Sequence, residues 1–208
     1  GYFRATGDDV TALAAVEREA SQMIGEFEKP IYVKYDEELC AHSRNKIDGC
    51  SRCLDVCPAS AIQSLGDHVN IDPVICGGCG LCGTVCPSGA AQTAYPPADQ
   101  LFSKMANLLN HYQEAGGKTP SLLLHDGIYG KEMIETIARY GSGLPANTLP
   151  VSMHAMGRAG HDVMVAAVAL GYHQVFVLLN PTKSLENEPL VDQVNLARAM
   201  LAGVHADA

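Results

Sequence analysis

Residues 76–87 read CGGCGLCGTVCP and place four cysteines, Cys76, Cys79, Cys82 and Cys86, at the spacing C-x2-C-x2-C-x3-C, followed directly by proline. Most of this stretch has an earlier copy, because GCSRCLDVCP at 49–58 repeats the order of GCGLCGTVCP at 78–87. In both copies a glycine, three cysteines and a proline hold the same relative places. The sequence therefore contains two equivalent cysteine-rich halves.

The spacing of this run is that of bacterial iron–sulfur proteins. Three thiolates two residues apart on a tight loop can bind three corners of one [4Fe–4S] cluster, and the cysteine before the proline binds the neighbouring cluster. A disulfide framework does not predict repeated gaps of two and three residues that end in proline. A structural zinc site explains paired C-x2-C spacings but not an unbroken run of four. We therefore expect iron–sulfur clusters.

The crossing of the fourth cysteine assigns the ligands of two clusters. An ungapped first copy needs a cysteine at position 47, but Ile47 cannot bind iron and Cys40 is the only cysteine left over. The expected ligands of cluster I are Cys40, Cys50, Cys53 and Cys86, and those of cluster II are Cys57, Cys76, Cys79 and Cys82. Asp36 or Asp48 is a weaker alternative to Cys40, since thiolate is the softer ligand.

The residues before Cys40 support its assignment. YDEELC at 35–40 resembles NIDPVIC at 70–76, because in both a short strand and an acidic turn lead into a cysteine. Residues 41–47 then form an insertion between the first two ligands of cluster I. Its polar, basic character favours a solvated loop over a cover or docking site that would tune cluster I.

The whole segment 31–93 resembles the two-cluster bacterial ferredoxin family, with its halves related by a pseudo-twofold axis. The resemblance implies an α+β ferredoxin-like module that carries two [4Fe–4S] clusters and transfers electrons. The sequence departs from the family pattern in the first loop.

The rest of the chain predicts a helix before this module and a second domain after it. Residues 8–27 form an amphipathic helix that Asp8 or Asp9 can cap. From residue 98, strands alternate with helices, which predicts an α/β domain with a short parallel sheet covered on both faces. The expected domains are 1–30, the N-terminal helix; 31–93, the ferredoxin module; 94–97, a linker; and 98–208, the α/β domain. The expected helices are 98–114, 129–140, 160–170 and 187–202, and the expected strands are 121–125, 148–154 and 174–179.

Histidines of this second domain stand at strand ends and helix starts. His125, His154, His161 and His173 are the candidates for a metal or general-base role. Capping and contact with solvent explain most histidines in such places, and we favour that interpretation.

Three stretches of the second domain carry a further resemblance: LLLHDG at 122–127, PVSMHAMGR at 150–158 and the helix–strand segment 162–179. They resemble the hydrogenase iron–sulfur (delta) subunit family, which passes electrons between a hydrogenase and heterodisulfide-reductase-like partners. That family has cysteines at the strand ends, where this sequence has His125 or Asp126, His154 and Asn180. The resemblance therefore implies a docking domain that carries no cluster.

Composition restricts the partners and the compartment. The net charge of −9 argues against a nucleic-acid partner, which needs a basic surface. No apolar run is long enough to span a membrane, and no signal peptide is visible. All eight cysteines lie between positions 40 and 86, which favours a reducing compartment, the cytoplasm. The chain opens on Gly1 rather than Met, which indicates a piece of a longer polypeptide.

Together these features predict an electron-transfer iron–sulfur protein that relays single electrons to or from a larger oxidoreductase and performs no bond chemistry itself. Two alternatives remain open. In the first, the α/β domain of an oxidoreductase subunit binds a flavin or a nucleotide and receives electrons from the module. In the second, the clusters are structural, and the protein is a non-redox scaffold or a sensor.

Overall fold

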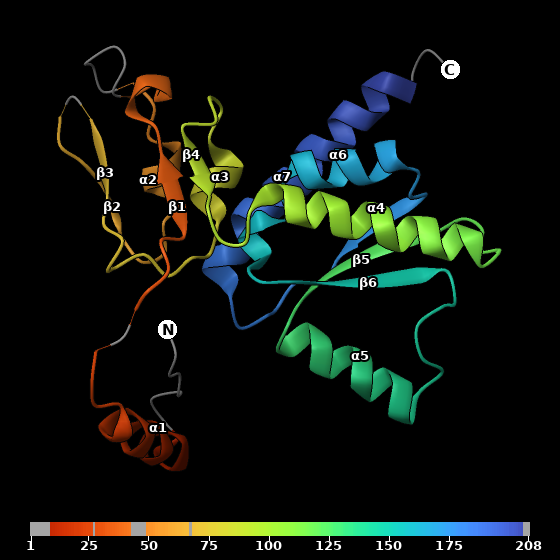
Figure 1. Cartoon of the computed structure of the whole chain (residues 1–208), viewed down its shortest axis with the longest axis horizontal. Helices are drawn as coiled ribbons and strands as arrows, with labels where there is room; N and C mark the ends of the chain where they lie inside the picture. Colours follow the sequence, from red (N-terminus) through yellow and green to blue (C-terminus); the bar gives the residue numbers. More distant parts are fainter. Residues whose placement is uncertain (1–8, 27, 43–48, 67, 206–208) are drawn as a thin grey trace. The chain divides into compact units, whose positions relative to one another are not determined.

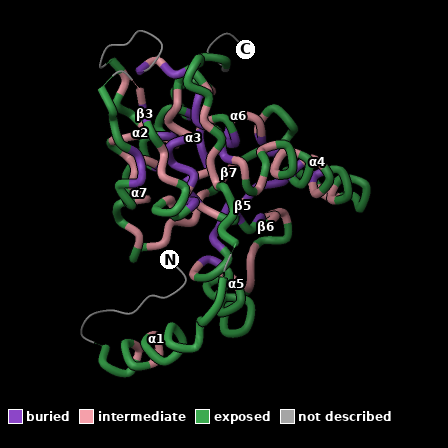
Figure 2. Tube along the Cα trace, turned by 60° about the vertical axis from the view of Figure 1, so that its left-hand side comes forward, coloured by how far each residue is buried: buried purple, intermediate pink, exposed green. Residues whose placement is uncertain are grey.

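The computed structural model describes residues 9–26, 28–42, 49–66 and 68–205. The chain divides into two compact units, residues 1–30 and 31–208. The first unit contains helix α1 (Val10–Gln22), whose N-terminus is capped by Asp9 through a 2.9 Å hydrogen bond from the amide of Ala12. This confirms the predicted helix over a shorter range, while Asp8 lies outside the described residues. None of the α1 residues is buried, as the tube of Figure 2 shows.

Two antiparallel strand pairs form the frame of the cysteine module. Strand β1 (Val33–Tyr35) pairs with β4 (Ala91–Thr93), so the two ends of the module lie together. Strand β2 (Ile62–Ser64) pairs with β3 (Val69–Ile71). Between the pairs, helix α2 (Arg52–Asp55) contacts helix α3 (Leu81–Val85), as Figure 1 shows. Each half of the repeat thus contributes one short helix to the module and one strand to each of the two strand pairs.

The C-terminal region is built on a three-stranded parallel sheet. Strand β5 (Ser121–Asp126) is central, with β6 (Thr148–Met153) on one side and β7 (Gln174–Val177) on the other. The helices are α4 (Ala98–Glu114), α5 (Tyr129–Tyr140), α6 (His161–Leu170) and α7 (Ser184–His205). The parallel α/β arrangement was predicted from the alternation of strands and helices. Helix α7 begins earlier than predicted and contains Pro189.

One face of this sheet holds the main core. Leu122, Leu124 and Val151 are fully buried against Met105 of α4 and Val163 of α6. Because these strand residues alternate along the pleat, they all face the same side of the sheet. Figure 1 shows α4 and α6 on this side and α5 alone on the other.

The opposite face is only partly covered, which corrects the expectation of a sheet buried on both sides. Helix α5 sits close to β5, where a Cβ atom on Gly130 would lie 2.7 Å from the Cβ of His125. One helix does not cover three strands, so Pro150 and Ser152 are exposed and Phe176 is 48% exposed.

The cysteine module and the α/β region share a core within the unit 31–208. Leu81 of α3 is fully buried in the same cluster as Val151. The 3-10 turn η2 (Met156–Arg158) packs against the second cysteine run, where the hydroxyl of Thr84 donates a 2.6 Å hydrogen bond to the carbonyl of Gly157. The predicted linker at 94–97 therefore joins two parts that bury each other's side chains. In the part of the chain that the structure describes, no helix is long and apolar enough to cross a membrane.

Candidate iron–sulfur site

Two equivalent turns lead into Cys40 and Cys76. The carboxylate of Asp36 accepts a 3.0 Å hydrogen bond from the amide two residues further on, and that of Asp72 accepts the corresponding bond at 2.7 Å. The amide of Cys40 then donates to the carbonyl of Glu37 at 3.1 Å, and that of Cys76 donates to the carbonyl of Asp72 at 3.0 Å. Each cysteine thus stands four residues after a capping aspartate. The Asp36 carboxylate is engaged with the backbone, and Asp48 lies outside the described residues.

The insertion after Cys40 begins with a buried histidine, which corrects the expectation of a solvated loop at this position. His42 has no exposed surface, and its Nδ1 lies 3.0 Å from the carbonyl oxygen of Cys50. Its Nε2 lies 3.0 Å from the hydroxyl of Ser64, which in turn accepts a 3.3 Å hydrogen bond from the amide of Gly66. Nδ1 can donate to the Cys50 carbonyl and the Ser64 hydroxyl can donate to Nε2, so both ring nitrogens take part in this chain of hydrogen bonds. Residues 43–47 of the insertion lie outside the described residues.

The fourth cysteine of each half receives a backbone hydrogen bond. The amide of Ala61 donates to Cys57 Sγ at 3.3 Å, and the amide of Ala91 donates to Cys86 Sγ at 3.4 Å. Burial raises the pKa of Cys86, but the hydrogen bonds from Ala91 and Ser88 outweigh burial, and the pKa is lowered. Hydrogen bonds to cluster-binding sulfurs are one of the factors that set a cluster's reduction potential.

The thiol of Cys53 identifies one group of neighbouring cysteines. Its pKa is raised to about 11, first by burial and then by the negative charges of Cys40, Cys50 and Cys86. Because this repulsion requires proximity, these four side chains share one neighbourhood. They come from three separate places in the sequence: the turn after β1, the start of α2 and the end of α3.

A second group surrounds Cys79 and Cys82. Burial is the largest cause that raises the pKa of Cys82 to about 12, followed by the charges of Cys79 and Cys76 and, least of all, by the charge of Cys53 from the first group. The pKa of Cys79 is raised by burial first, and also by the charges of Glu186, Cys57 and Cys76. The second group therefore joins Cys57 of the first half to three cysteines of the second half.

These groups fit a cationic cofactor. Several thiolates cannot share a half-buried site without a compensating positive charge, and iron supplies that charge as it displaces the thiol protons. All eight cysteines are free thiols in the structure. Among the described residues, no three His, Cys, Asp or Glu side chains converge on a point for a single ion. A [4Fe–4S] cluster does not need such convergence, since each of its irons takes one thiolate.

Two glycines of the second cysteine run allow neighbouring side chains to approach it. Gly78 has φ +71°, and a Cβ there would lie 2.7 Å from the ring of Tyr32. Gly80 has φ +83°, and a Cβ there would lie 2.7 Å from Cγ of Arg158. Any side chain at these positions would adopt a strained backbone conformation and collide with its neighbour. The ring of Tyr32 and the aliphatic part of the Arg158 side chain therefore lie next to the loop that carries Cys76 and Cys79.

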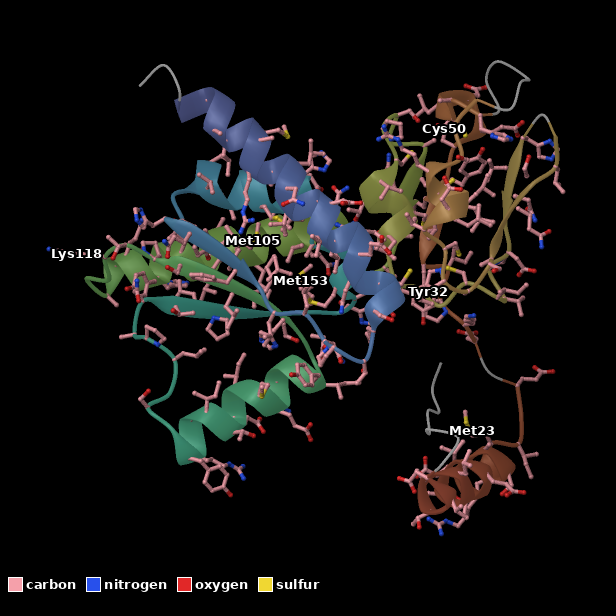
Figure 3. The ribbon with its side chains drawn as sticks, turned by 180° about the vertical axis from the view of Figure 1, so that it is seen from behind. Met23, Tyr32, Cys50, Met105, Lys118 and Met153 are labelled. Carbon is pink, nitrogen blue, oxygen red and sulfur yellow. The ribbon has the colours of Figure 1, made fainter. Side chains whose placement is uncertain are left out.

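Three rings pack together beside this loop. His154, which follows β6, stacks on Tyr32 with ring centroids 6.3 Å apart and contacts Tyr95 edge-on at 5.7 Å. Figure 3 labels Tyr32 where the cysteine module meets the α/β region, and Cys50 at the other end of the module. This cluster could not be predicted from the sequence, because its members come from three separate segments.

The strand-end residues of the α/β region make structural hydrogen bonds. The carboxylate of Asp126 accepts bonds from the amides of Ile128 and Gly130 at 2.8 and 3.2 Å, and the side chain of Asn180 donates to it at 3.5 Å. Although burial raises the pKa of Asp126, these bonds outweigh it and the pKa is lowered. Asp126 thus binds the amides at the start of α5.

The histidines of this region are held in a similar way. His125 Nδ1 lies 2.7 Å from the carbonyl of Asp126, and His161 Nδ1 lies 2.6 Å from Oε1 of Gln193. The amide of His173 donates to the carbonyl of Pro120 at 2.7 Å. These contacts agree with the interpretation that the histidines are structural.

Comparison with known proteins identifies one family. Residues 47–90 match the family model of the 4Fe-4S dicluster domain, a range that contains every cysteine of the chain except Cys40. Neither the curated proteins nor the solved structures include a match to this chain. The segment 47–90 is therefore a ferredoxin-type iron–sulfur domain.

Proposed function

We propose that this protein binds two [4Fe–4S] clusters and relays single electrons to or from a redox partner protein. The observation that carries the proposal is the grouping of the cysteine side chains. Cluster I takes Cys40, Cys50, Cys53 and Cys86; the pKa of Cys53 is raised first by burial and then by the charges of the other three. Cluster II takes Cys57, Cys76, Cys79 and Cys82, which interact around Cys79 and Cys82.

The assignment of Cys40 rests on two further observations. The Asp36 turn before Cys40 repeats the Asp72 turn before Cys76, so the two cysteines open equivalent halves. Cys40 is also buried, with 7% of its surface exposed, in a cluster of side chains that contains Cys53, Cys57, Cys82 and Cys86. A buried thiol beside three other thiols is the natural fourth ligand.

The chain's own residues would hold and tune the two clusters differently. When bound, [4Fe–4S] clusters accept and release one electron each, at potentials set by hydrogen bonding, charge and solvent exposure. The amides of Ala61 and Ala91 donate to the two crossing cysteines and stabilise their negative charge. Arg158 lies beside the loop of cluster II, and His42 holds the backbone at Cys50 of cluster I.

The contacts within the unit 31–208 suggest separate roles for the two clusters. The α/β region packs against the second cysteine run, at Thr84 and at the carbonyl of Cys79. We assign the electron-transfer role to residues 31–93 and a docking role to residues 98–208, as the resemblance to the delta-subunit family implies. Cluster II would then face the docking region, and cluster I would exchange electrons with a second partner.

The test is metal analysis and spectroscopy of anaerobically prepared protein. We expect about eight irons and eight sulfides per chain, with two reducible paramagnetic centres. Cys53→Ser should lose or alter one centre and Cys79→Ser the other. Metal-free protein, or cysteines joined in disulfides, would contradict the proposal. Clusters that cannot be reduced would favour a scaffold or sensor, and flavin in the purified protein would favour the enzymatic alternative.

A further inference from the structure

A cavity lies beside the second cysteine run. Its volume is about 260 Å³, and it is lined by Gly78 of that run, the start of α4 and the carboxyl end of β6. Ligands of parallel α/β sheets bind outside the carboxyl ends of the strands, so the position is one where the fold allows a binding site. The volume suits a small metabolite, since it lies just below the usual range of drug-sized pockets.

Two cations line this cavity in a chain whose net charge is −9. Lys104 of α4 donates from Nζ to the carbonyl of Ser152 at 3.3 Å, which holds its charge at the cavity wall. Arg158 is half-buried, and its burial lowers its pKa, although the charge of Asp162 opposes this shift. Among the described residues that line the cavity there is no Asp or Glu. An anion would therefore complete the charge balance of this site.

The remaining lining residues are largely apolar. Leu101 and Met153 form part of the wall, and Pro96 and Pro97 add further apolar surface. The rings of Tyr95 and His154, which contact each other edge-on, complete the lining. The cavity thus combines an apolar wall with two cations.

We infer that this cavity is a binding site for a small organic carboxylate with an apolar body. The carboxylate would bind between Lys104 and Arg158, and the body would contact Leu101 and Met153. A carboxylate suits Arg158 because the planar guanidinium group can donate two parallel hydrogen bonds to it.

The site has a consequence that rests on the proposed function. Gly78 lies between Cys76 and Cys79, so a bound carboxylate would place a negative charge next to cluster II. That charge would lower the cluster's reduction potential, and reduction of the cluster would weaken ligand binding by the same factor. The cavity would then couple ligand binding to the direction of electron flow.

The test uses the intact protein with its clusters and two probes of the same shape, benzoate and neutral benzamide, in titration calorimetry. We expect benzoate to bind at least about tenfold more tightly than benzamide, as a charged hydrogen-bonded group requires. Lys104→Met and Arg158→Gln should each weaken benzoate binding about tenfold. Lys118→Met is the matched control, because Lys118 follows the end of α4 and Figure 3 places it far from Met153. It should leave binding unchanged.

Several results would overturn the inference. These are absent benzoate binding, equal affinity for benzoate and benzamide, or Lys104→Met binding like the unaltered protein. Binding of inorganic phosphate without benzoate would also overturn the assignment of an organic carboxylate. Lys104 is exposed, so its variant tests the site even if Arg158→Gln disturbs the fold. Iron analysis of the same samples separates the two proposals: protein with two reducible clusters and no benzoate binding contradicts only the site, and benzoate-binding protein without iron contradicts only the proposed function.

Discussion

The imidazole of His42 lies 3.0 Å from the carbonyl oxygen of Cys50 and, on its other nitrogen, 3.0 Å from the hydroxyl of Ser64. It therefore ties the start of the insertion to the backbone of a proposed cluster I ligand and to strand β2. A fully buried ring with both nitrogens bonded is a structural constraint on the geometry of that ligand.

His42→Phe should loosen cluster I. Phenylalanine keeps the ring but leaves the Cys50 carbonyl and the Ser64 hydroxyl without this partner, which costs about 1–3 kcal/mol. We expect faster release of about half of the iron to a chelator. His111→Phe is the control, because the His111 side chain is exposed and its Nδ1 lies 3.1 Å from Oε2 of Glu114 in the same helix. Identical release from both variants would show that His42 has no such role.

Cys40→Ser should affect one cluster alone. Serine is a harder and less favourable ligand for iron than cysteine, so the cluster that Cys40 binds should be lost or shifted in potential. The paramagnetic resonance spectrum of the reduced protein should keep the signal that Cys79→Ser removes. Two unchanged clusters in Cys40→Ser would remove Cys40 from the ligand set.

Gly157→Ala should separate η2 from the second cysteine run. A Cβ at this position would collide with the carbonyl oxygen of Cys79 and would lie 2.9 Å from a side-chain carbon of Leu81. Overpacking of this kind costs about 1–3 kcal/mol, so we expect a lower melting temperature. Gly203→Ala is the matched control, since nothing lies within 4 Å of its added Cβ. A Gly157→Ala melting temperature equal to that of the control would contradict the predicted contact.

Cluster assembly on the iron-free protein should speed up as the pH rises. Burial raises the pKa of Cys53 to about 11 and that of Cys82 to about 12, so both thiols are protonated near neutrality and must lose a proton to bind iron. Incorporation at constant iron and sulfide can be followed at pH 7 and at pH 8.5. A rate that falls over this range would contradict the prediction.

The same two thiols should make the iron-free fold less stable in alkali. Their folded-state pKa values lie above the ordinary value of 9.0. As the pH rises, the two thiols therefore ionise in the unfolded chain before they ionise in the folded chain. The stability that they contribute is complete below pH 9.0 and is lost as the pH rises toward 11 and 12. Urea unfolding of iron-free protein at pH 8 and at pH 10.5 should show this loss, and greater stability at pH 10.5 would be the opposite result.

The periodic elements of the α/β region could be predicted from the sequence. Helices α4 and α5 have the predicted bounds, because each is strongly amphipathic and ends near glycine. Buried runs such as 121–124 predicted parallel strands, but which strand lies at the centre of the sheet could not be read from the pattern. The incomplete cover of the second sheet face also depends on where α5 packs, which no local pattern determines.

The cysteine motif predicted the iron–sulfur domain because its spacing is set by the cofactor itself. The burial of His42 was not predicted, since a single histidine in a polar loop gives no signal of its partners. The cavity was missed for a similar reason: its lining runs from Gly78 to Arg158, and only the folded chain brings Lys104 and Arg158 together.

The burial of Leu81 of α3 in one core with Val151 of the parallel sheet limits how this protein can be dissected. Cutting the chain at residues 94–97 would leave Leu81 facing water and remove the partner of the Thr84 hydroxyl. The ferredoxin-type segment thus cannot be separated from the α/β region without loss of buried contacts. A truncated version made to study the iron sites alone would carry an exposed apolar surface that the intact chain buries, and this surface would favour self-association.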